Sequence, residues 1–248
     1  VKTGEYQGST AWSTATVNSL EGSLMAGYID TDNKGAIHKM EYQSGTGTLA
    51  GYGGNRTVFN NAATSYIKLV DDPDTNRMVV FYRDGGNSNY GTSRVFSTED
   101  TNNAFETMGA EVVFYSDTFS YHQACYDTVA NKIVLVHVHN GDSFAVVATV
   151  TGGTTNTCAF ATVVKFMGDG ISQNSGQLNY LQLMMNTTLG RVQLLAEASG
   201  KAGRQELSGR AHEKPPVVAT IKVTGTTPSI HNFSRLNSEM GFSKKGII

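Results

Sequence analysis

Short apolar runs separated by turn-forming residues recur along the whole chain. Residues 78–82 (Met-Val-Val-Phe-Tyr) lie between Asp72-Pro-Asp-Thr-Asn and Gly85-Gly-Asn-Ser-Asn. Asp, Pro and Asn gather in tight turns because Pro restricts φ and the Asp and Asn side chains bond to nearby backbone. A continuous β-prone run between two such turns predicts a short strand that is buried on both faces.

The same pattern repeats four times when four aromatic residues are aligned. These are Trp12, Tyr66, Tyr121 and Tyr180, and their spacings are 54, 55 and 59 residues. An apolar run begins twelve residues after each of them, at residues 24–28, 78–82, 133–137 and 192–196. A second run follows the next turn, at residues 36–40, 91–96, 144–150 and 217–223. Each unit then closes on a segment that contains Phe59, Phe114, Phe166 or Phe233.

Four short strands in a unit of roughly 55 residues match the size of a β-propeller blade. The fold class we expect is therefore all-β, a β-propeller-like array of four four-stranded repeats. The repeat domain covers residues 1–234, with units at about 1–59, 60–114, 115–166 and 167–234, and residues 235–248 form a linker into a following domain. A single sheet cannot bury both faces, so the units must stack. Because four blades make a small ring and the chain resembles a piece of a longer polypeptide, we expect further units or a symmetric partner to complete the ring.

Two segments depart from the regular pattern. Residues 178–195 are rich in Leu and Met and could form a helix, but Asn186-Thr-Thr-Leu-Gly interrupts them where the other units have their first turn. The repeat therefore favours two strands here. Residues 199–214 are an insertion, polar, glycine-rich and charged, which predicts a projecting loop of the kind that often carries recognition.

Composition narrows the possible partners. Charged residues make up only 16% of the chain, while Gly contributes 27 of its 248 residues. The formal net charge is −2, so no general attraction draws the chain to nucleic acid or to an anionic membrane. No apolar run approaches the ~18 residues of a membrane span. We therefore expect no nucleic-acid partner and no membrane insertion.

One stretch carries a family resemblance. Residues 72–92 (Asp-Pro-Asp-Thr-Asn-Arg-Met-Val-Val-Phe-Tyr-Arg-Asp-Gly-Gly-Asn-Ser-Asn-Tyr-Gly-Thr) resemble a repeat of tail-fibre-like and other large structural proteins of bacteriophages, especially marine and cyanobacterial ones. The third unit keeps only part of the pattern, with Tyr126-Asp-Thr-Val-Ala-Asn-Lys and Val138-His-Asn-Gly. Residues 236–244 also resemble the segment that leads out of such repeats. The resemblance implies a virion structural or adhesin-like protein and brings no catalytic residues.

A polar and aromatic loop in the second unit is the candidate ligand-binding site. Tyr, Asn and Arg recognise sugars and protein surfaces with little loss of side-chain entropy. The alternative is a turn at the edge of a blade, packed on its neighbour, which we favour. The candidate residues are Tyr82, Arg83, Asp84, Asn87, Asn89 and Tyr90.

The metal candidates are weaker. His137 and His139 lie two residues apart on a predicted strand, so both rings point to one face. His122 becomes a neighbour only if the strands pair suitably, and we favour histidines without a metal. Asp72, Asp74 and Asn76 alternate like the start of a calcium loop, but Arg77 and Arg83 occupy the positions that need Gly and Glu, so we favour a hairpin turn. We expect no cofactor.

Nothing marks an active site. The chain has no Gly-x-Ser-x-Gly, phosphate loop or sialidase-type Asp box. Carboxylates for glycoside hydrolysis exist, but no pair stands apart. These are Glu21, Glu41, Asp84, Glu106 and Glu111. Cys125 and Cys158 are expected as small buried apolar side chains, with a disulfide as the alternative.

These observations predict a non-catalytic virion module, part of a tail fibre or spike, that is exposed to the extracellular medium and presents loops to the host surface. Many copies would convert weak contacts into lasting attachment. The expected partners are copies of itself, in a homo-oligomer such as a trimer, other virion proteins and a host-surface glycan. The alternatives are a purely architectural spacer or decoration protein of the virion and, less favoured, a polysaccharide-degrading tailspike.

Overall fold

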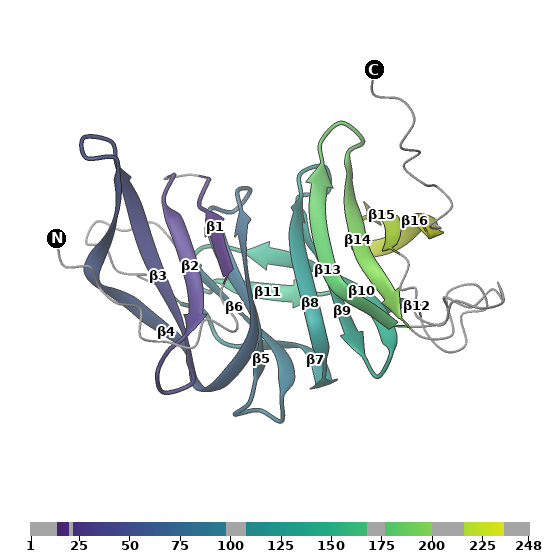
Figure 1. Cartoon of the computed structure of the whole chain (residues 1–248), viewed down its shortest axis with the longest axis horizontal. Coiled ribbons are helices and arrows are strands. Elements are labelled where there is room, and N and C mark those ends of the chain that lie inside the picture. The colour runs from purple at the N-terminus through teal and green to yellow at the C-terminus, as the bar shows by residue number, and fades with distance from the viewer. Residues whose placement is uncertain (1–13, 20–21, 98–107, 168–176, 200–215, 236–248) are drawn as a thin grey trace, which may run out of the picture.

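The computed structural model describes residues 14–19, 22–97, 108–167, 177–199 and 216–235 (Figure 1). These residues form sixteen strands and contain no helix, so nothing in them could cross a membrane as an apolar helix. All pairings between the strands are antiparallel. The prediction of an all-β fold is confirmed.

The strands make three sheets, which follow one another along the chain. The first has seven strands in sequence order and forms the purple-to-teal half of Figure 1: β1 Thr14–Val17, β2 Leu24–Ile29, β3 Lys34–Gln43, β4 Thr48–Asp72, β5 Arg77–Asp84, β6 Tyr90–Ser97 and β7 Val112–Thr118. The second has the order β11-β10-β9-β8, with β12 also paired to β10: β8 Ser120–Asp127, β9 Lys132–His139, β10 Asp142–Thr151, β11 Thr157–Phe160 and β12 Val164–Met167. The third is a four-stranded meander: β13 Gln177–Asn186, β14 Arg191–Ser199, β15 Pro216–Thr224 and β16 Thr227–Arg235.

The eight apolar runs expected to be strands all lie in strands, and residues 178–195 are β-structure, as predicted. β13 and β14 meet at the turn that begins at Asn186. The helical alternative fails because Asn186 Oδ1 accepts the Leu189 amide (2.9 Å) and Gly190 has a φ of 60°, which makes a tight reversal.

The long strand β4 joins two of the expected units. Its first part pairs with β3 as far as Ala63, and its second part pairs with β5 from Thr64 onward. The expected closing residue Phe59 therefore lies inside a continuous strand. For this reason the first two expected units share one seven-stranded sheet, although each keeps four strands in meander order.

The core consists of three apolar clusters, and the central strands contribute to two of them. Met78, Val80 and Tyr82 of β5 join a cluster with β2 and β3, whereas Val79 and Phe81 join a cluster with β8, β9 and β10. Alternate residues of a strand point to opposite faces, so a strand between two layers must be apolar at every position. In the same way β9 divides its residues between the second cluster and a third one shared with β13, β14 and β15.

The first turn of each expected unit recurs at the same spacing as the aromatic residues. In the last three of these turns, a side-chain oxygen of the first residue (Asp72, Asp127 or Asn186) accepts backbone N–H groups two or three residues later. The fifth residue of all four turns has a left-handed backbone, with φ of 67°, 54°, 51° and 60°. These residues are Gly22, Asn76, Asn131 and Gly190. The turn interpretation of Asp72, Asp74 and Asn76 is therefore confirmed.

Two of the aligned aromatic residues occupy corresponding places. Tyr66 and Tyr121 both have a left-handed backbone, with φ of 53° and 57°, and each lies at a break in the register of its hairpin. Their rings are 5.9 Å apart. Tyr180 lies at the corresponding register break of the β13–β14 hairpin. Trp12 lies outside the described residues, as do the predicted insertion at residues 199–214 and the predicted linker at residues 235–248 except for their first residues, which end β14 and β16.

A phenylalanine packs over a glycine in both halves of the seven-stranded sheet. Phe59 and Phe114 lie where the β3–β4 and β6–β7 registers shift. An added Cβ at Gly35 would lie 2.4 Å from the Phe59 ring, and one at Gly91 would lie 2.6 Å from the Phe114 ring. These separations leave no room for a methyl group, so glycine is required for the ring to cover the strand.

We predict that Gly35→Ala and Gly91→Ala each lower the free energy of unfolding by about 2–3 kcal/mol, because the buried rings must move. Urea denaturation followed by tyrosine fluorescence measures the change. Gly45→Ala is the matched control, since a Cβ there meets nothing within 4 Å. Equal stabilities for all three variants would contradict this account of the Phe–Gly packing.

Candidate functional site

The candidate loop connects β5 to β6 and turns tightly. Asp84 pairs with Tyr90 across the hairpin. The Asn87 amide donates to the Asp84 carbonyl (3.2 Å), and the Tyr90 amide donates to the Asn87 carbonyl (2.9 Å). Asn89 has a φ of 62°, a left-handed conformation that asparagine tolerates better than most residues. The side chains of Asn87 and Asn89 are exposed, and Tyr90 is half-buried.

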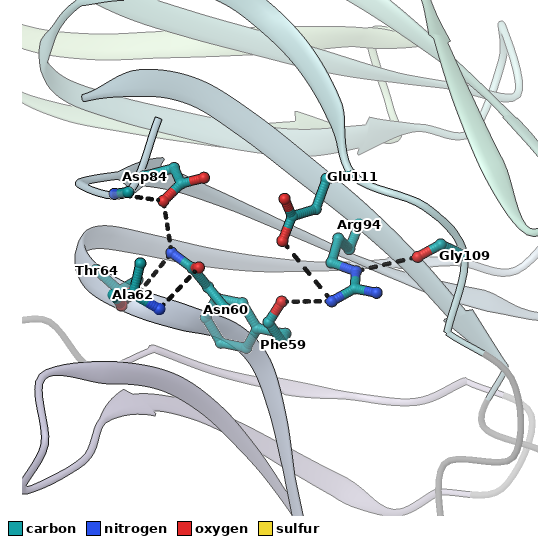
Figure 2. Close-up of polar contacts among 9 residues, drawn as sticks. Phe59, Asn60, Ala62, Thr64, Asp84, Arg94, Gly109 and Glu111 are labelled. Carbon is teal, nitrogen blue, oxygen red and sulfur yellow. Dashed lines mark hydrogen bonds and ion pairs between the residues drawn. The ribbon is translucent and has the colours of Figure 1, made fainter. Parts of the chain in front are cut away.

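Beneath this tip, Asp84 is buried in a set of hydrogen bonds that we call the polar frame (Asn60, Thr64, Asp84 and Gly86; Figure 2). One Asp84 carboxylate oxygen accepts from the Asn60 side-chain amide (3.0 Å) and from the Gly86 backbone (2.9 Å). The same Asn60 amide donates to Thr64 Oγ1 at 3.0 Å. The polar frame therefore ties the β5–β6 turn to strand β4.

A second polar contact lies beside the polar frame. Arg94 on β6 donates to the Phe59 carbonyl (2.7 Å) and to the Gly109 carbonyl (3.0 Å), and its guanidinium lies 3.8 Å from Glu111 (Figure 2). Backbone acceptors from two separate segments hold this arginine. Its role is therefore to fasten the segment before β7 to strand β4.

Tyr82 and Arg83 point into the molecule rather than to the tip. The buried Tyr82 ring packs on Phe59, with centroids 4.9 Å apart. Burial, and then the charges of Glu111 and Asp84, raise the pKa of the Tyr82 phenol far above its usual value, so it stays neutral. Arg83 donates to Ser65 Oγ (2.9 Å) and lies 4.6 Å from the centre of the Tyr66 ring. Of the six candidate residues, the structure places only Asn87 and Asn89 fully in solvent.

The histidine candidates lie in different surroundings, although both contact Tyr115. His139 is half-buried; its ring bonds to the Thr118 carbonyl through Nδ1 and accepts from the Asn140 amide at 2.8 Å. His137 is fully buried and stacks on Phe144, with ring centroids 5.3 Å apart. The strands do pair suitably for His122, which lies directly opposite His137 in the β8–β9 register.

The buried pair His122 and His137 is neutral. Burial is the main cause that lowers the pKa of both imidazoles to about 3; His137 lowers the pKa of His122 further, and His139 lowers that of His137. All four ring nitrogens are buried without a hydrogen-bond partner. Among the described residues no group of three or more His, Cys, Asp or Glu side chains is arranged to hold a metal ion.

The remaining candidates are dispersed. Cys125 is half-buried, Cys158 is buried, and both are free thiols. Burial raises the pKa of each thiol, so both stay protonated. Glu21 and Glu106 lie outside the described residues, as does the side chain of Glu41.

Lys68 was not among the predicted site residues. It lies on β4 in a groove of about 340 Å³ that also includes Thr16, Asp71, Cys125, Tyr126 and Leu183. A sequence signal does exist, because Lys68 interrupts an apolar strand between Ile67 and Leu69. Its neighbours in space come from other units, which no local pattern indicates.

No protein-family model matches this sequence, and no curated protein matches it significantly.

We predict that Asp84→Ala lowers the free energy of unfolding by about 2–3 kcal/mol, because the buried Asn60 amide loses its acceptor and the Gly86 backbone amide loses the bond that holds the turn. Thermal unfolding measures the loss. Asp74→Ala, an exposed carboxylate in the β4–β5 turn, is the control and should change stability far less. A change no larger than that of the control would show that the polar frame is not stabilising.

We also predict acid lability. Above pH 6.5 both buried histidines are neutral in the folded and unfolded states. Between about pH 6.5 and pH 3 the unfolded chain binds protons that the folded chain excludes. The free energy of unfolding therefore decreases as the pH is lowered, and at pH 5 it is about 2 kcal/mol lower per histidine than at neutral pH. Urea denaturation at a series of pH values measures the slope. His137→Leu should remove about half of it, whereas His231→Gln, at an exposed position on β16, should leave it unchanged.

Proposed function

We propose that this chain is a structural module of a bacteriophage virion, part of a tail fibre or spike, that presents loops for attachment to the host surface and catalyses no reaction. In this proposal the chain lies on the outside of the virion. Its partners are further copies of itself, other virion proteins and a host-surface glycan.

We propose further that the sheets form a β-propeller-like array of four units. Three observations support this arrangement: the first turns recur at spacings of 54, 55 and 59 residues, Tyr66 and Tyr121 share a left-handed bulge, and successive sheets pack face to face. The first strand of each proposed unit packs against the next along the series β1, β4, β8 and β13.

The observation that carries the attachment proposal is the contrast between the tip and the base of the β5–β6 loop. Asn87 and Asn89 are exposed, while the polar frame below them is buried and hydrogen-bonded. A rigid loop loses little conformational entropy when it binds, and its amides can both donate and accept hydrogen bonds to sugar hydroxyls. The resemblance of residues 72–92 to a phage fibre repeat agrees with this use.

The test is binding of the fluorescently labelled chain to host cells and to a glycan array. We expect the double variant Asn87→Ala with Asn89→Ala to bind at least tenfold less, while its melting temperature falls only by the modest amount that alanine at one left-handed position costs. Asn232→Ala is the matched control, because it is exposed and has the same left-handed backbone on β16. Equal binding by all variants would show that the β5–β6 loop does not contact the host surface. Release of reducing ends from host polysaccharide would instead indicate a degrading tailspike.

An architectural module is the second candidate, and the outer face of the last sheet favours it. Met184 is 52% exposed and Leu195 is 42% exposed on the adjacent strands β13 and β14. Exposed apolar side chains on neighbouring strands suit a subunit contact. Chains that self-associate in sedimentation experiments and bind neither cells nor glycans would favour this second function.

A further inference from the structure

The groove around Lys68 is the place where the first strands of all four proposed units meet, and we call it the first-strand groove. Thr16 comes from β1, Lys68 from β4, Cys125 and Tyr126 from β8, and Leu183 from β13. Its volume is about 340 Å³, at the lower end of the range for small-molecule sites, and it is open to solvent rather than enclosed.

Lys68 brings a positive charge to this groove without forming an ion pair. Within the described part of the chain, no carboxylate lies within ion-pair distance of its ammonium group. Asp71 also lines the groove with a carboxylate of opposite charge, but its two carboxylate oxygens accept from the Asn18 side chain (3.3 Å) and the Ser19 backbone (3.1 Å). These bonds hold the Asp71 carboxylate at the first turn of the chain, outside ion-pair distance of the Lys68 ammonium.

The Cys125 thiol, which also lines the groove, carries no charge at neutral pH. Burial raises the pKa of the Cys125 thiol, so the thiol is neutral beside the lysine. Burial also lowers the pKa of Lys68. A half-buried ammonium with no counter-ion costs free energy, and a bound anion would offset that cost.

The walls of the groove combine apolar and hydroxyl groups. Leu183 is the partly exposed apolar side chain of the groove, Leu69, Val70 and Ala124 are almost wholly buried, and the hydroxyls come from Thr16, Thr128 and Tyr126. An apolar side chain suits the C–H face of a sugar ring, and hydroxyl groups suit its OH groups. A single lysine with no arginine suits one carboxylate better than a run of phosphates, which needs several positive charges.

We propose that the first-strand groove binds an acidic sugar, with the carboxylate paired to Lys68 and the ring held between β4, β8 and β13. This site is separate from the β5–β6 loop. Lys68, Asp71 and Tyr126 lie toward the first turns of the hairpins, and the loop with Asn87 and Asn89 lies at the other end of β5.

The test is calorimetric titration of the intact chain with a galacturonic acid trisaccharide. The neutral galactose trisaccharide is the matched ligand. We expect the acidic sugar to bind and the neutral one to bind at least tenfold more weakly. Lys68→Met should remove that preference, because it keeps the length of the side chain and deletes the charge. Lys222→Met, at an exposed position on β15, should keep it.

Two measurements separate loss of a ligand contact from loss of the fold. The Lys68→Met variant should melt at the same temperature as the unaltered chain, or higher, because an unpaired charge is removed. Cys125→Ala should bind the acidic trisaccharide normally, since the neutral thiol supplies no charge. The proposal would be overturned if the chain bound the acidic and neutral sugars equally, or if Lys68→Met kept the preference for the acidic sugar. It would also be overturned if the chain bound a single-stranded oligonucleotide through Lys68 and did not bind the sugar.

The outcome is also distinguishable from failure of the proposed attachment function. If the chain binds host cells, and if Lys68→Met still prefers the acidic trisaccharide to the neutral one, the groove proposal fails and the attachment proposal stands. If the chain binds the acidic trisaccharide through Lys68 and binds no host cell, the groove proposal stands and attachment fails.

Discussion

The fold depends on burying the central strands on both faces. β5 and β9 each divide their alternate residues between two apolar clusters, so each lies between two other layers. Fully burying a Val, Leu or Phe side chain contributes about 1.5–3 kcal/mol. A separated sheet would expose one full set of these residues, and for this reason no single sheet of the molecule is expected to be stable by itself.

Buried polar residues between the stacked sheets are accommodated either by hydrogen bonds or by staying uncharged. Asp84 and Asn60 satisfy each other through hydrogen bonds at the end of the β5–β6 hairpin. His122 and His137 instead lie among aromatic rings with no hydrogen-bond partner at either ring nitrogen. A buried neutral imidazole is far less costly than a buried charged one, so the packing of β8 on β9 favours the deprotonated form.

The two proposed contact regions follow from the geometry of an antiparallel meander. Successive turns of a meander alternate between the two ends of the strands, so the first turns gather at one end and the second turns at the other. The polar frame supports an exposed tip at one end of β5, and the first-strand groove includes Pro73 and Thr128 of the turns at the other end. A module with recognition chemistry at both ends of its strands could hold a partner at one end while it binds at the other.

The candidate loop illustrates the limit of local sequence reasoning. The run from Tyr82 to Tyr90 correctly predicted a hairpin, because Gly, Asn and Ser at these positions specify a turn. The direction of each side chain was not readable, since it depends on the register between β4 and β5. Tyr82 and Asp84 alternate with Arg83, so the first two are buried on one face of β5 while Arg83 lies on the other, against Ser65 and Tyr66.

The strands, the turns and their spacing could be predicted from the local sequence, because turn formation and β-propensity act over a few neighbouring residues. The local sequence also predicted that residues 178–195 form a hairpin and not a helix. The three-dimensional packing was needed to show that Phe59 lies within a continuous strand, that His122 faces His137, and that Lys68 shares a groove with residues from three other strands. These features depend on which strand edges and faces meet, and the residues that those three strands bring to the groove lie more than fifty positions from Lys68 in the sequence, where no local pattern connects them.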